Sequence, residues 1–96
     1  MKHLRVRWFH NSVEDPVVLY SEIDDERWEI RKVDEYVDGR RDLAGTGIET
    51  GSTFLAEDQT PSIEEINSDP QFEAVEITAE EFEAVWDQAK EWFDLP

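Results

Sequence analysis

Hydrophobic and polar positions alternate through the first half of the chain, the pattern of β-strands with one buried face. Leu4, Val6 and Trp8 fall on one side of the first stretch, and Arg5 and Arg7 fall on the other. Similar stretches predict further strands over 17–24, 28–37 and 40–44. Short polar turns and an Asp-Gly step at 38–39 separate them, which indicates an antiparallel meander. The stretch from 28 to 37 is its middle strand.

The register of the second and third strands depends on the turn between them. A two-residue turn at 25–26 would place Glu22 opposite Glu29, an unfavourable pair of like charges worth about 0.2–1 kcal/mol. Arg27 and Arg31 would share that face and offset the repulsion.

The apolar phase changes within the third strand. Trp28 and Ile30 occupy even positions, whereas Val33 and Val37 occupy odd ones. A bulge or sharp twist near Lys32 would bring both pairs to one face, and this is the interpretation we favour. The alternative leaves Val33 and Val37 half-exposed on the outer face.

The second half predicts shorter elements. In order, these are a glycine-rich loop over 45–51, a further strand over 53–56, a short helix over 61–66, and a strand or extended connector over 72–77. Either Thr60, followed by Pro61, or Ser62 can act as the N-cap of the short helix.

The last element is a helix that begins with a capping box at Thr78 and Glu81. Its apolar residues form one broad stripe: Phe82, Val85, Trp86, Ala89 and Phe93. We expect this stripe to pack on the inward face of the sheet, the side of Leu4 and Val6. The predicted fold is therefore α+β: an antiparallel sheet of four to five strands, covered on one face by the C-terminal helix, with one short helix, in a single domain over 1–96.

The composition excludes several kinds of site and indicates a cellular location. The chain has 96 residues and no cysteine, so it has no disulfide and no cysteine-based metal site. It has no signal-peptide pattern and no apolar run long enough for a membrane span. We expect a soluble cytoplasmic protein.

Net charge is the most unusual feature. The formal charge is −16 and the sequence pI is about 4.2. Residues 1–48 carry 8 Lys/Arg against 11 Asp/Glu (−3), and residues 49–96 carry 1 against 14 (−13). Such a field repels nucleic acid and anionic membranes and attracts basic proteins. Two alternatives remain: acidic helix faces are common solvated surface, and a protein from a salty cytoplasm is acidic for hydration.

Catalytic and metal-binding patterns are weak. His3 and His10 lack the spacing to other ligands that a metal or base site needs. The acid run at 24–26 lacks the spacing and glycine of a calcium loop, and no nucleophile elbow or phosphate loop is present. We therefore expect no catalytic residue, metal or cofactor.

Several short motifs recur in one known family. They include Trp8-Phe9-His10, the run from Tyr20 to Asp24, Asp38-Gly39, the run from Pro61 to Asn67, and Glu81-Phe82 with Trp86. In this combination the chain resembles a family of small acidic bacterial proteins catalogued only as a domain of unknown function. The resemblance implies no activity or binding residues.

Two surfaces are candidates for binding. The first is acidic and lies on the two predicted helices, which we expect to be adjacent: Glu64, Glu65, Glu80, Glu83, Asp87 and Glu91. The second is the charged outer face of the sheet: Tyr20, Glu22, Arg27, Glu29 and Arg31. We expect a non-catalytic protein-binding module, of an immunity or antitoxin type, that binds a basic partner through the first surface. A small-ligand or enzymatic module using the second surface is the alternative, and the oligomeric state stays open.

Overall fold

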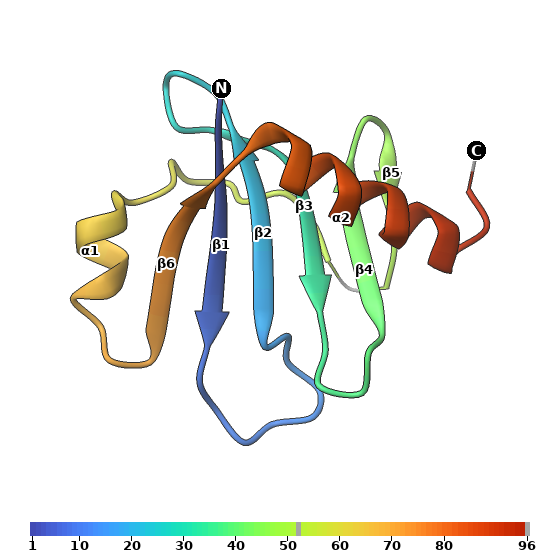
Figure 1. Cartoon of the computed structure of the whole chain (residues 1–96), viewed down its shortest axis with the longest axis horizontal. Helices are drawn as coiled ribbons and strands as arrows, with labels where there is room; N and C mark the ends of the chain where they lie inside the picture. The colour runs from blue at the N-terminus through green and yellow to red at the C-terminus, as the bar shows by residue number, and fades with distance from the viewer. Residues whose placement is uncertain (52, 96) are drawn as a thin grey trace.

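The computed structural model describes residues 1–51 and 53–95, which form one antiparallel sheet and two helices (Figure 1). The elements are β1 (Lys2–Trp8), β2 (Val18–Ile23), β3 (Glu29–Glu35), β4 (Arg41–Gly45), β5 (Ile48–Glu49), α1 (Ile63–Asn67), β6 (Phe72–Ile77) and α2 (Ala79–Trp92). The sheet order is β5-β4-β3-β2-β1-β6. This confirms the predicted α+β class, with six strands where four or five were predicted.

Two uncertain segments are now assigned. Residues 72–77 form β6, which pairs along β1 at the edge of the sheet. The further strand predicted over 53–56 is wrong, because this segment forms no strand and crosses the sheet instead. The short helix is confirmed, and Ser62 is its N-cap, accepting a hydrogen bond from the Glu65 backbone N–H. Neither helix of the described chain is long and apolar enough to cross a membrane.

The turn between β2 and β3 has three residues, so the predicted two-residue turn is wrong. Asp24 N–H donates to the Trp28 carbonyl, and the Asp24 carboxylate accepts from the backbone N–H groups of Glu26 and Trp28. Arg27 closes the turn with a positive φ of 70°. Such a three-residue turn shifts the register relative to a two-residue one.

The register of β2 and β3 therefore differs from the prediction. Ile23 pairs with Glu29, and Glu22 pairs with Arg31. Ile30 is the extra residue between these pairs, so the bulge that we favoured is confirmed two positions before Lys32. The bulge does not bring all four apolar residues to one buried face, because Trp28 and Val37 are exposed whereas Val33 is buried.

The helix α2 covers the sheet face opposite to the predicted one. On β1 the ring of His3, rather than Leu4, packs against Phe82 of α2, with ring centroids 5.3 Å apart. The main core lies under α2: Val33, Leu43, Ile77, Phe82, Trp86 and Ala89. The bulge at Ile30 puts Val33 on this face, where it packs in the apolar core under the helix.

The other face, which carries Leu4 and Val6, is covered by residues 53–62, which we call the crossing segment, and by α1 itself. This segment passes across the sheet on the side away from α2 (Figure 1). Ala56 N–H donates to the Glu29 carboxylate, and Asn67 of α1 exchanges two hydrogen bonds with the backbone of Ala74. The sheet is thus the middle of three layers.

Candidate functional site

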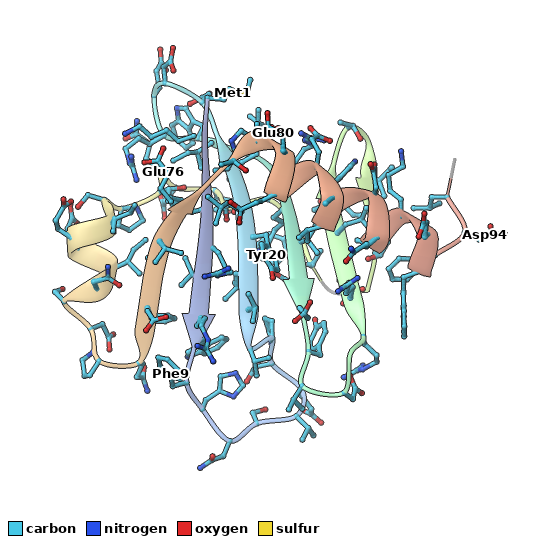
Figure 2. The ribbon with its side chains drawn as sticks, in the orientation of Figure 1. Met1, Phe9, Tyr20, Glu76, Glu80 and Asp94 are labelled. Atoms are coloured by element: carbon cyan, nitrogen blue, oxygen red, sulfur yellow. The ribbon has the colours of Figure 1, made fainter. Side chains whose placement is uncertain are left out.

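The acids predicted on α2 form an outward row. Glu80, Glu83, Asp87 and Glu91 are all exposed, and Glu80 stands at the start of the helix (Figure 2). Glu83 binds Arg31, whereas no cationic group of the described chain lies within 4.0 Å of the other three carboxylates. Three acids on one side of a helix therefore face solvent with their charge uncompensated.

The acids predicted on α1 lie elsewhere. Glu64 and Glu65 are exposed, but α1 packs on β6 and lines a cavity with Val6 and Leu19, on the face away from α2. The expectation that the two helices are adjacent is therefore wrong. The short loop 68–71 connects α1 to the edge strand, and this connection holds it on the far side of the sheet (Figure 1).

The residues predicted to share the outer sheet face are divided by the register shift. Tyr20, Glu22 and Arg31 lie on the α2 face, Glu29 lies on the opposite face, and Arg27 lies in the turn. Arg27 donates to the backbone carbonyls of Thr60 and Pro61, which ties the crossing segment to the turn. The prediction that these residues share one open face is therefore wrong.

Arg31 stands at the centre of a charged network beneath α2. Its Nε and Nη2 atoms donate to the two oxygens of Glu22 at 2.7 and 2.8 Å, and Nη2 also binds Glu83 of the helix. His3 Nε2 lies 2.8 Å from Glu22 Oε2. Only 7% of Glu22 is exposed, so its negative charge is stabilised by hydrogen bonds to its partners in place of water.

Aromatic rings complete the setting of Arg31. Its Cζ atom lies 5.0 Å from the ring centroids of both Phe82 and Trp86, within the range of cation–π attraction. The hydrogen bonds from Arg31 lower the pKa of Glu22, against burial, which raises it. The same guanidinium lowers the pKa of Glu83. The network holds α2 on the sheet, and no apolar periodicity in the sequence marks it.

The helix α2 crosses only one end of this sheet face, and no described helix lies over the rest of it (Figure 1). Tyr20 lies there on β2 beside the helix (Figure 2), near Arg5, Glu35 and Arg41. Arg41 pairs with Glu35 at 3.1 Å. Burial raises the pKa of the Tyr20 hydroxyl, and Glu35 adds to this while the two arginines oppose it. Mixed charges on this open part favour neither a cation nor an anion.

His10 has a structural role at the end of β1. Its Nδ1 accepts from the Ser12 backbone N–H, so Nε2 carries the proton and donates to the Pro16 carbonyl at 2.8 Å. Both nitrogens are used within the turn. His10 is thus a polar residue that fixes the chain after the end of β1.

Sequence reasoning missed two cavities that described residues line on the face away from α2. One, of about 390 Å³, lies between α1 and the sheet, with mostly apolar walls that include Val6, Leu19 and Phe72. The other, of about 500 Å³, lies between the loop before β2 and the crossing segment, and Asp34 lines it. Both form only because α1 and the crossing segment lie over this face, so no local motif could have indicated them.

Comparison with known proteins identifies a family but no activity. The family model described as "Domain of unknown function (DUF6881)" matches residues 2–91. No curated protein and no solved structure matches the chain.

Proposed function

The chain belongs to the DUF6881 family, and we propose that it is a non-catalytic module that binds a basic protein through the outward side of α2. The observation that carries this proposal is the uncompensated row of Glu80, Asp87 and Glu91 on a helix firmly packed on the sheet. More specifically, we propose an immunity or antitoxin role in a bacterial cytoplasm. The absence of cysteine agrees with a reducing compartment.

In this proposal the acidic row speeds association by attracting the basic partner through electrostatic steering. A protein of formal charge −16 attracts a basic partner over distances near the Debye length, about 8–10 Å at physiological salt. Charged groups at the rim of an interface act mainly on the association rate. Because α1 faces the other way, Glu64 and Glu65 contribute to this field without touching the same part of the partner.

The C-terminal end of α2 supplies apolar contacts beside the acids. Trp92 is 55% exposed and Phe93 is 37% exposed, next to Glu91. Exposed aromatic residues are the usual anchors of protein interfaces, surrounded by a polar rim. We propose that this end of the helix forms the apolar centre of the interface.

The test is a double charge reversal, Asp87→Lys with Glu91→Lys. Both side chains are exposed, and neither has an ion-pair partner in the described chain, so the fold should persist. Glu83 is avoided because it binds Arg31. Wild-type protein is immobilised on a resin and exposed to native lysate at low salt. It should capture a basic protein, identified by mass spectrometry, and the resin carrying the reversed variant should not. With the purified partner, reversal should slow association and flatten its salt dependence.

The matched control is Asp25→Lys with Glu26→Lys, in the exposed β2–β3 turn. It changes the net charge equally at another place and should retain most of the binding. Equal loss in both variants would mean that only the overall charge attracts the partner. Capture of the same basic protein by the α2 variant and wild type, at equal association rates, would refute the proposed surface.

A further inference from the structure

The cavity lined by Asp34 combines a buried carboxylate with aromatic walls. Its floor is formed by β2 and β3, and the crossing segment closes one side. The lining residues that define its chemistry are Trp8, Glu14, Asp15, Lys32, Asp34 and Phe54. At about 500 Å³ it falls within the range of small-molecule sites, about 300–1,000 Å³.

Asp34 is the unusual group. Only 5% of the residue is exposed, and Thr53 Oγ1 donates to its Oδ2 atom. Its Oδ1 atom accepts no hydrogen bond from any described residue; Lys32 Nζ forms an ion pair with it at 3.7 Å, which is too long for a hydrogen bond. A buried acceptor without a hydrogen bond is costly, by about 1–3 kcal/mol, so natural proteins seldom retain one without a use.

The charge of the lining selects a cation. Glu14 and Asp15 stand exposed at the rim, so three carboxylates face a single ammonium group, that of Lys32. An anionic ligand would meet these carboxylates in a protein that is already strongly negative. A cationic group is therefore the chemistry that Oδ1 and the rim favour.

The aromatic walls distinguish an organic cation from a metal ion. Phe54 is 59% exposed although it is fully apolar, and Trp8 presents a half-buried indole. Metal ions such as calcium need six to eight oxygen ligands. The three carboxylates of this cavity, like every other set of acidic, histidine or cysteine side chains in the described residues, are not grouped so that they could hold a metal ion. Aromatic faces attract ammonium groups and pack well against an apolar body.

We propose that this cavity binds a small primary amine, whose ammonium group is held at Asp34 Oδ1 and whose apolar body rests against Trp8 and Phe54. The site is independent of the acidic side of α2, because it lies on the opposite face of the sheet. It thus adds a small-ligand function to the proposed protein binding, and either can hold without the other.

The first experiment uses phenethylamine as the probe, with 2-phenylethanol as its neutral counterpart. Calorimetric titration and the intrinsic tryptophan fluorescence, to which Trp8 is one of four contributors, should show saturable binding of the amine. The dissociation constant should lie near the value of about 1 mM that so small a ligand reaches. The alcohol should bind at least about tenfold more weakly, because it lacks the charge. No saturation by phenethylamine up to about ten times that concentration, or equal binding of the two compounds, would overturn the proposal.

Substitutions then locate the site. Asp34→Asn keeps the shape of the side chain and removes its charge, so amine affinity should fall at least about tenfold. Glu73→Gln, on the exposed edge strand, removes one charge at a distance and should leave affinity unchanged. Equal affinity in Asp34→Asn and wild type would mean that the amine is attracted only by net charge, and would refute the site.

A second variant covers the case in which Asp34→Asn does not fold. Phe54→Ala changes an exposed residue, so folding should be retained, and amine binding should weaken several-fold through loss of the apolar wall. Unchanged binding in this variant would place the amine elsewhere and overturn the proposal. Capture of a basic protein is not expected to change in either variant, which separates failure of this site from failure of the α2 surface.

Discussion

At the scale of single residues, Arg31 compensates the charge of the sheet face that α2 covers. It neutralises Glu22, reaches Glu83 on α2, and fills the space under Phe82 and Trp86. Its strand neighbour Gly45 has a φ of 130°, and a Cβ atom there would lie 2.7 Å from the Ile30 carbonyl oxygen. The bulge and the glycine therefore allow β3 and β4 to approach closely beside the guanidinium.

Arg31→Met should cost about 3–5 kcal/mol of the free energy of unfolding at neutral pH, because it leaves Glu22 buried without its cation. The same change at Arg7, an exposed arginine, should have little effect. Urea unfolding curves of the two variants measure the difference. A loss at Arg31 no larger than that at Arg7 would show that the network does not stabilise the fold.

The same network predicts the response to acid. Arg31 holds the pKa of Glu22 below its ordinary value of 4.5, so the folded state binds this proton less readily than the unfolded state. The stabilisation is therefore complete above about pH 4.5 and is lost as the pH falls through the lower, folded pKa. In Arg31→Met this part of the pH dependence should disappear, which urea curves at several pH values between about 6 and 3 will test.

At the scale of elements, α2 is the cover of the main core rather than a detachable arm. Trp86 is 4% exposed and stacks on Phe82, whose ring centroid lies 6.4 Å away. A capping box formed by Thr78 and Glu81 fixes where the helix begins. The apolar stripe read from the sequence is thus the packed side of the helix.

Trp86→Ala should cost about 3–5 kcal/mol, a large share of the 5–15 kcal/mol that is typical of a domain. Trp92→Ala removes the same side chain from an exposed position on the same helix and should change stability by only about 0.5 kcal/mol. Chemical denaturation compares the two. A cost below about 1 kcal/mol at Trp86 would contradict the packing.

At the scale of the whole molecule, repulsion among carboxylates opposes folding. Of the 25 acidic residues, only six lie within 4.0 Å of a cationic group in the described chain. Most of the charge is therefore solvated and subject to screening, since the Debye length falls from about 30 Å at 0.01 M salt to 3 Å at 1 M.

The melting temperature should accordingly rise between about 10 mM and 1 M sodium chloride. Differential scanning calorimetry at fixed pH measures this rise, and the Asp87→Lys, Glu91→Lys variant should show a smaller one because it carries less excess charge. Constant melting temperatures would mean that the acids do not repel each other measurably. A need for molar salt to fold would favour adaptation to a salty cytoplasm.

Local patterns in the sequence determined the elements, because strand alternation, helix stripes and capping boxes are properties of neighbouring residues. The strands around Val6, Tyr20 and Val33 and the stripe through Trp86 were readable in this way, and the cap of α1 was narrowed to Thr60 or Ser62. The weakly patterned stretch 45–56 was not, because β5 lies in the predicted loop and no strand forms over 53–56. The overall excess of acid was equally a property of the sequence.

Tertiary structure alone decided which face each element covers. A three-residue turn and one bulged residue, Ile30, reassigned Glu22, Glu29 and Val33 between faces, and a shift of one residue is enough to reverse a strand. The same packing put α1 and α2 on opposite sides and buried Asp34 under the crossing segment. Contacts between residues far apart in the chain set these outcomes, and no pattern of neighbouring residues records them.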